Sequence, residues 1–98
     1  MSGLKAKIEG ARKLARDSRE RAAASLLDVD SVLQCITRAA ADGLNTLTIA
    51  PEKPLDLSGT EAARELVKKL AAAGASCEWT PRRRGVDGPN VPELTISW

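Results

Sequence analysis

The sequence predicts a small α+β domain in which two N-terminal helices precede a β-α-β-β unit. Three observations support this class. Apolar residues recur at helical spacing up to Gly43 and Gly74, which suit the left-handed position after a helix. Apolar and polar residues alternate in residues 45–51 and 93–98. A connection rich in glycine and proline joins the last two strands. We expect a three-stranded mixed sheet in the order 1-3-2, with the helices on one face.

The first segment, residues 3–27, contains strong helix formers and no proline. A seam of mostly small residues follows a heptad-like spacing of alternating fours and threes along it. Its members are Leu4, Ile8, Ala11, Ala15, Ser18, Ala22 and Ser25. Three readings of the seam remain open: packing on the chain's own domain, association with copies of itself, or docking in a partner protein's groove. The candidate contact residues are Leu4, Ile8, Ala11, Ala15 and Ala22.

Two further helices are predicted at about residues 30–42 and 59–73. Asp30 is the expected N-cap of the first, because a carboxylate accepts a hydrogen bond from a free amide of the opening turn. Ser58 and Glu61 have the spacing of a capping box at the start of the second. An apolar stripe along each helix is expected to face the sheet.

The last two strands, at about residues 76–82 and 93–98, are expected to form a hairpin. Opposing Trp79 to Ile96 matches polarity at every pair, and it places Arg82 opposite Glu93. Pro81 cannot donate a ladder hydrogen bond, so its strand belongs at an edge and the final strand at the centre. Both tryptophans are expected in the core.

Composition limits the function classes. The chain of 98 residues has a formal charge of +2, which divides into +4 for residues 1–27 and −2 for residues 28–98. We therefore separate a basic N-terminal helix, an expected oligomerisation arm, from a small α+β domain. Sixteen alanines give a thin core, which favours self-association as a source of stability. No apolar run approaches the ~20 residues that span a membrane, so we expect a cytoplasmic protein without a membrane partner.

The residues for common catalytic and metal sites are missing. The chain has no histidine, no GxGxxG and no phosphate-binding P-loop motif. Cys35 and Cys77 are too far apart for a CxxC motif and are expected to pack as small hydrophobic residues. Acid pairs such as Asp28 and Asp30 lie at helix starts, where the helix dipole favours them. We expect no enzymatic activity, no cofactor and no metal.

Basic residues suggest nucleic-acid binding as an alternative function. The N-terminal helix contributes Arg12, Lys13 and Arg16, and the hairpin loop contributes Arg83 and Arg84. Lysine and arginine bind nucleic acids through phosphate contacts. No recognised nucleic-acid-binding motif accompanies them.

The stretch Ile36 to Trp98, with "ITRAAADGLNTLTI", "ELVKKLAAAGASCEW" and "PELTISW", resembles a group of small bacteriophage and prophage proteins. This resemblance implies a phage accessory or virion-associated protein, located in the host-cell cytoplasm or the virion, acting by self-assembly or protein binding. The segment at residues 55–79 is also similar to the helix-and-strand unit of STAS-type regulatory domains. That family's Asp-Ser-Ser-Gly phosphorylation loop is absent, which places a STAS-like regulatory role second.

Overall fold

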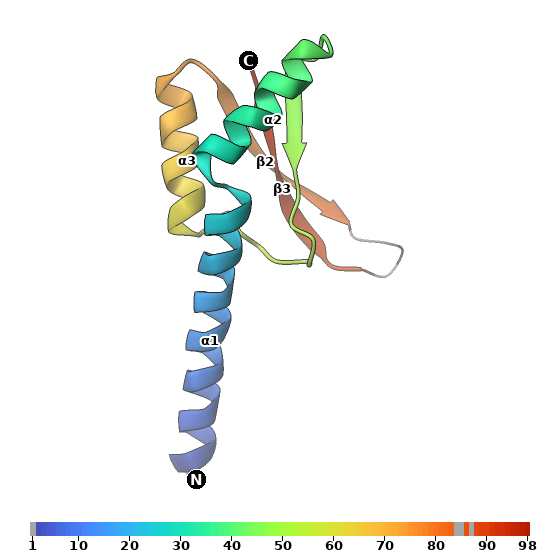
Figure 1. Cartoon of the computed structure of the whole chain (residues 1–98). Helices are drawn as coiled ribbons and strands as arrows, with labels where there is room; N and C mark the ends of the chain where they lie inside the picture. The colour runs from blue at the N-terminus through green and yellow to red at the C-terminus, as the bar shows by residue number, and fades with distance from the viewer. Residues whose placement is uncertain (1, 84–85, 87) are drawn as a thin grey trace.

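A computed structural model describes residues 2–83, 86 and 88–98. It contains three helices and three strands in the predicted order (Figure 1). The helices are α1 (Ser2–Leu26), α2 (Val29–Ala41) and α3 (Glu61–Ala72), and the strands are β1 (Thr46–Ile49), β2 (Ser76–Arg83) and β3 (Asn90–Ser97). Gly43 and Gly74 follow α2 and α3 with φ of 87° and 97°, which confirms both predicted helix ends.

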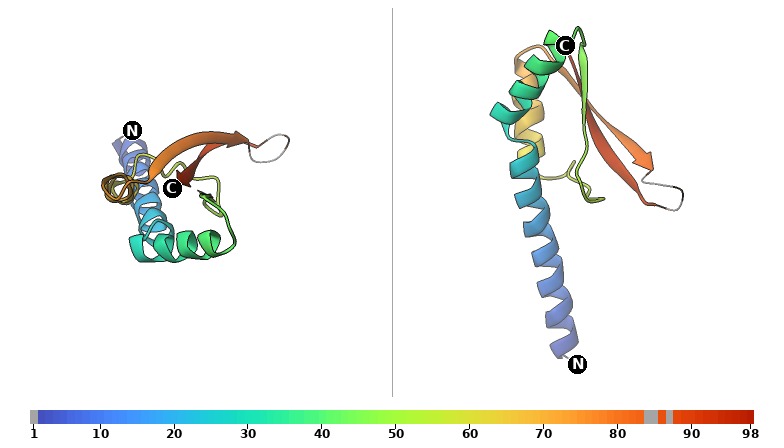
Figure 2. Two further views of the ribbon diagram at one scale, coloured as in Figure 1. Left: turned by 90° about the horizontal axis from the view of Figure 1, so that it is seen from above. Right: turned by 45° about the vertical axis from the view of Figure 1, so that its right-hand side comes forward.

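The sheet has the predicted strand order β1-β3-β2, and the helices lie on one of its faces (Figure 2). β3 pairs antiparallel with both neighbours. β1 and β2 therefore run in the same direction, as the β-α-β connection predicts, but β3 separates them. Every hydrogen-bonded pair is antiparallel, and the mixed pairing that we expected is absent from the described strands.

The core lies between the sheet and the three helices. Its largest fully buried side chains are Leu57, Leu66, Leu94, Ile96 and Val32. Ala23, near the end of α1, and Leu27, just after it, belong to the same cluster. The last turns of α1 are thus anchored in the core, which fixes the direction in which the rest of this helix leaves the domain.

Both helix N-caps differ from the prediction by two residues. Asp28, rather than Asp30, caps α2 by accepting a hydrogen bond from the Ser31 amide. Thr60, rather than Ser58, caps α3 by accepting from the Ala63 amide. The Ser58 amide and hydroxyl instead donate to the Asp56 carboxylate, so a local turn uses the expected cap.

The hairpin register differs from the predicted one by two residues. Cys77 lies opposite Ile96 and Trp79 lies opposite Leu94, whereas we expected Trp79 opposite Ile96. A shift of two residues keeps every side chain on its face, so the alternation of polarity allows both registers. The longer strands, which extend to Arg83 and begin at Asn90, shorten the connection between them.

The expected contact between Arg82 and Glu93 is present in a different geometry. Thr80 is the residue directly opposite Glu93. Arg82 reaches Glu93 diagonally, with 3.5 Å between Nε and Oε1. The ion pair is therefore confirmed although the register that predicted it is wrong.

Three residues expected in the core are more exposed than predicted. Trp98 follows β3 and is 39% exposed, while its amide donates to the Asn45 carbonyl. Cys35 is exposed on α2, and Leu33 on the same helix is also exposed. The inward side of α2 is narrower than its apolar stripe and is centred on Val32 and Ala39.

Candidate functional site

The N-terminal part of α1 projects from the domain as an arm, defined here as residues 3–17. Every residue of the arm is exposed, and the molecule measures 59 × 32 × 17 Å (Figure 1). Its radius of gyration is 16.0 Å, whereas a compact domain of about 100 residues has about 13 Å. The arm is about 22 Å long at the helical rise per residue. It therefore presents a large surface that its own domain leaves uncovered.

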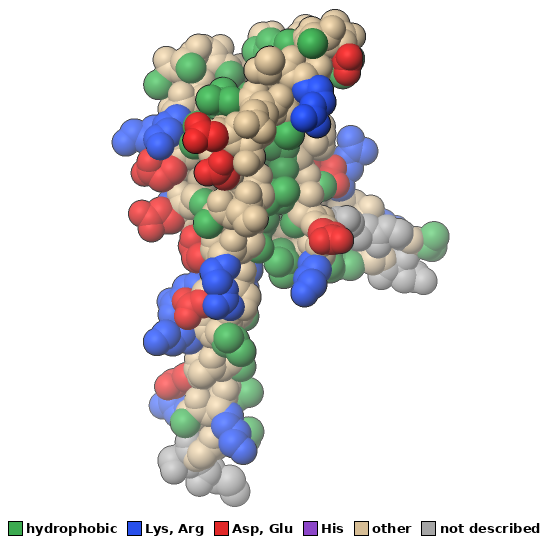
Figure 3. All heavy atoms as spheres, viewed as in Figure 1, with side chains coloured by type: hydrophobic (Ala, Val, Ile, Leu, Met, Phe, Trp, Pro, Cys, Tyr) green, Lys and Arg blue, Asp and Glu red, His purple; other side chains and the backbone are tan. Residues whose placement is uncertain are grey.

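Large apolar side chains lie uncovered on the arm. Leu4 is 66% exposed, Ile8 48% and Leu14 63%. Hydrophobic side chains gather along one side of the arm, below the body of the domain (Figure 3). Leu4, Ile8, Ala11 and Ala15 fall within an arc of about 60° at 3.6 residues per turn. The structure thus brings four of the five predicted contact residues together on one exposed stripe.

The stripe continues upward into a groove at the root of the arm. This root groove has a volume of about 610 Å³ and is lined by α1, α2 and the connection that follows β1. Ser18, Ala22 and Leu26 line it from α1, Cys35 from α2, and Leu55 and Leu57 from the connection. Ala22, the fifth predicted contact residue, is half-buried here. The seam is therefore exposed along the arm and forms one wall of a groove at its root.

A contact between helices holds the root of the arm in place. Both carboxylate oxygens of Glu20 accept a hydrogen bond from the Glu61 amide, each at 3.2 Å. This amide is one of the unpaired donors of the first turn of α3, where negative charge is favourable. Together with the burial of Ala23, the contact couples the direction of α1 to the position of α3.

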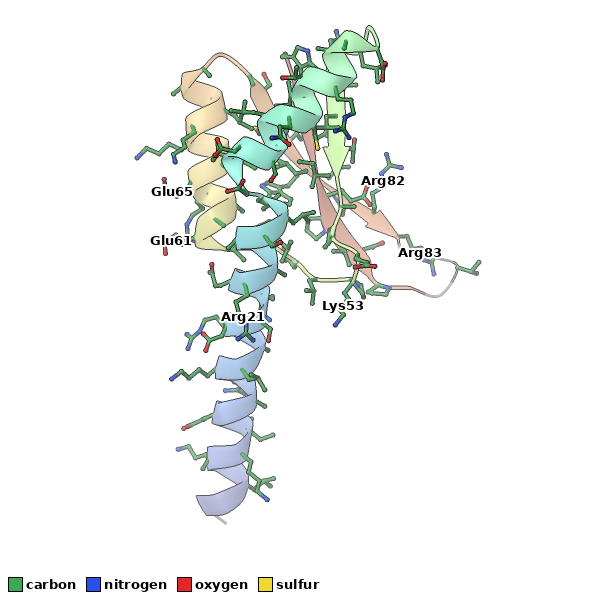
Figure 4. All side chains as sticks on the ribbon, viewed as in Figure 1. Arg21, Lys53, Glu61, Glu65, Arg82 and Arg83 are labelled. Carbon is green, nitrogen blue, oxygen red and sulfur yellow. The ribbon has the colours of Figure 1, made fainter. Side chains whose placement is uncertain are left out.

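The predicted basic residues do not form one site. Arg12 and Arg16 share a side of α1 with Lys5 and Arg19, within an arc of about 60° at the helical repeat. We call these four residues the basic stripe; it lies about 80° around α1 from the apolar one. Lys13 lies about 60° beyond Arg16, on the side away from the apolar stripe, and lines the same hollow as Arg12, Arg16 and Arg19. Arg83 lies on the hairpin, which points away from the arm (Figure 4). Arg84 lies outside the described residues.

The thiols offer little chemistry. Burial raises the pKa of the Cys77 thiol, which lowers its thiolate fraction at neutral pH. Cys35 lines the root groove, next to Ser31 and Glu52 in the same lining. Across residues 2–83, 86 and 88–98, no group of three or more cysteine or acidic side chains is arranged to hold a metal ion. No helix in this part of the chain has the length and apolar character needed to cross a membrane.

Comparison with protein-family models, with curated proteins and with solved structures finds no match. The candidate function therefore rests on the arm, the root groove and the basic stripe themselves.

Sequence reasoning missed two parts of this surface. Leu14 lies beside the apolar stripe and was not among the predicted contact residues, although its place in the predicted helix was visible in the sequence. The root groove depends on how the connection after β1 passes α1, which no local pattern specifies. A helical projection of residues 3–27 is enough to place Leu14 beside the apolar stripe and to group the basic stripe on one side. It cannot predict the groove.

Proposed function

We propose that this protein is a non-enzymatic assembly module that associates with copies of itself through α1. The observation that carries the proposal is the exposed apolar stripe on an arm that its own domain does not cover. Its resemblance to small phage and prophage proteins supports the further proposal of an accessory or virion-associated role, in the host-cell cytoplasm or the virion.

Helix physics supports an assembled state. Helices in proteins owe most of their stability to packing of an apolar face, and isolated helical segments shorter than about 12–15 residues are marginal in water. The arm is anchored only at its C-terminal end, by Ala23 and the Glu20 contact. Covering Leu4, Ile8 and Leu14 removes apolar surface from water and stabilises the arm.

Light scattering on the full-length chain tests the proposal. The double variant Leu4→Lys/Ile8→Lys places two charges on the apolar stripe and leaves the core residues unchanged. We expect the unmodified chain to be oligomeric at micromolar concentration and this variant to be monomeric. The two lysines add charge where burial requires apolar surface.

The matched control is Ala6→Lys/Ala24→Lys, which adds the same charge to the far side of α1. Ala6 and Ala24 are both exposed, so this control leaves the core residues unchanged. We expect it to remain oligomeric. A monomeric unmodified chain, or equal loss of assembly in both variants, would contradict self-assembly through the stripe.

The basic stripe favours nucleic-acid binding as a second candidate function. Arg12, Lys13, Arg16 and Arg19 line one shallow hollow on α1, together with the acidic Glu9. Arginines on one helix face suit contacts with phosphates along a nucleic-acid backbone, which carry no sequence information.

Fluorescence anisotropy with a labelled DNA duplex and a labelled RNA, across a salt series, tests this candidate. We expect Arg12→Ala/Arg16→Ala to weaken binding and to reduce the steepness of its salt dependence by about 2 for duplex DNA, because two phosphate contacts are lost. Arg38→Ala on α2 serves as the control and should leave the slope unchanged. Failure of the unmodified chain to bind at low ionic strength would eliminate the candidate.

A further inference from the structure

The seam on α1 is symmetric about position 13. Counted from that position, Leu4 mirrors Ala22, Ile8 mirrors Ser18, and Ala11 mirrors Ala15. Each large residue thus mirrors a small one, and the central pair is small on both sides. Two copies of the helix placed antiparallel, with a twofold axis at this level, bring each residue opposite its mirror position.

The shape of the molecule fits the same symmetry. Ser18 and Ala22 are the small members of the seam, and both line the root groove of about 610 Å³. Leu4 and Ile8 are the large members and are exposed near the free end of the arm. In the antiparallel arrangement, the free end of each arm reaches the root groove of the other copy. An apolar projection and an apolar groove therefore meet twice, once on each side of the axis.

The polar features of the groove agree with a helix end as its occupant. Glu52 lines the groove beside Lys53. α1 has no acidic residue of its own in its first turn, so the positive end of its dipole is uncompensated within the chain. The Glu52 carboxylate can compensate the dipole at the N-terminal turns of an arriving helix, while Lys53 in the same lining leaves the groove without net charge.

We infer that two copies of this chain form a twofold-symmetric pair through antiparallel α1 helices, with Leu4 and Ile8 of each copy seated in the partner's root groove. The inference rests on the proposed self-assembly and specifies its geometry. Leu14 is adjacent to the symmetry centre at the edge of the seam, so the two copies of Leu14 approach each other across the axis. The two bodies lie at opposite ends of the paired helices.

Disulfide cross-linking between full-length chains tests the orientation. Ile8→Cys and Ser18→Cys are made separately in a Cys35→Ser/Cys77→Ser background, and circular dichroism confirms that each variant folds. The antiparallel pair places position 8 of one copy level with position 18 of the other, within the ~7 Å Cα separation that a disulfide needs. Two copies of position 8 are separated by about 15 Å along the helix axis.

We expect oxidation of an equal mixture to give mainly the mixed 8–18 product, and each variant alone to give little dimer. Ala6→Cys mixed with Ala24→Cys, on the far side of α1, sets the background from random collision. Self-linked products at both positions would establish parallel helices and overturn the inference, as would mixed product no greater than this background.

Light scattering of the same background protein distinguishes failure of the antiparallel geometry from failure of self-assembly itself. An oligomer whose cross-links are not of the 8–18 type overturns the antiparallel geometry and leaves self-assembly standing. A monomer overturns both.

Discussion

At Thr60, one buried hydroxyl serves two backbone groups at the start of α3. It donates to the Leu57 carbonyl at 2.7 Å and accepts from the Ala63 amide at 3.2 Å, and the residue is only 4% exposed. Water has little access to replace either bond. This residue therefore fixes both the turn that precedes α3 and the first turn of the helix.

Replacing this hydroxyl tests its contribution to stability. Thr60→Val keeps the shape of the side chain and leaves the Ala63 amide without its partner, while the Leu57 carbonyl keeps the hydrogen bond from the backbone amide of residue 60. We expect the free energy of unfolding to fall by about 1–2 kcal/mol, as for the loss of an N-cap. Urea denaturation followed by circular dichroism measures the change.

Thr37→Val is the control for the same substitution in an exposed setting. The Thr37 hydroxyl donates to the Leu33 carbonyl within α2, where water can replace it. We expect a change below about 0.5 kcal/mol, as for most surface substitutions. An equal loss of stability in both variants would mean that the Thr60 hydroxyl contributes no more than an exposed one.

The cap residues also show where sequence reasoning at single positions fails. Ser58 and Thr60 both precede α3 and both have a side chain that can cap a helix. The choice depends on Asp56, which accepts hydrogen bonds from the Ser58 amide and hydroxyl. A competing local turn therefore decides the helix start, and spacing to Glu61 contains no information about that competition.

Among the elements, the helices and strands are specified locally and their pairing is not. Gly43 and Gly74 mark helix ends because each adopts positive φ, and the sequence identifies such positions well. The alternation in residues 93–98 correctly predicts that Leu94 and Ile96 face the core. The hairpin register differs, because opposing Trp79 to either Ile96 or Leu94 satisfies the same alternation.

The strand order could be deduced because one residue restricts it. Pro81 lacks an amide hydrogen, which suits an edge strand, and β2 does lie at an edge of the sheet. Exposure of Cys35 and Leu33 was not predictable in the same way. It depends on which face of α2 packs against the rest of the fold, and this is a property of packing between elements.

For the whole molecule, charge and shape act on assembly in opposite directions. The antiparallel pair that we infer matches large to small residues along the seam, but it also gathers the basic stripes of both copies along one flank. Arg12 of one copy approaches Arg12 of the other near the twofold axis. Like charges at this distance oppose association, and salt screens them over about 10 Å at 0.1 M and about 3 Å at 1 M.

Salt is therefore expected to strengthen the pair. We expect the dissociation constant of self-association, measured by sedimentation equilibrium, to fall as sodium chloride rises from about 0.05 to 0.5 M, because screening reduces this repulsion. Arg12→Gln should tighten association at low salt and flatten the salt dependence, whereas Lys13→Gln, on the far side of α1, should change neither. Association that weakens steadily with salt would contradict the antiparallel arrangement of the basic stripes.

The unbroken course of α1 has a consequence for the spacing of any assembly built from this chain. One helix passes from the core at Ala23 to the exposed end of the arm without a hinge, as Figure 1 shows. The length of this rigid helix, rather than a flexible linker, therefore sets the distance between the α+β domains of two associated copies. Each heptad inserted into the arm would lengthen the helix by about 10.5 Å while keeping the apolar stripe in nearly the same direction.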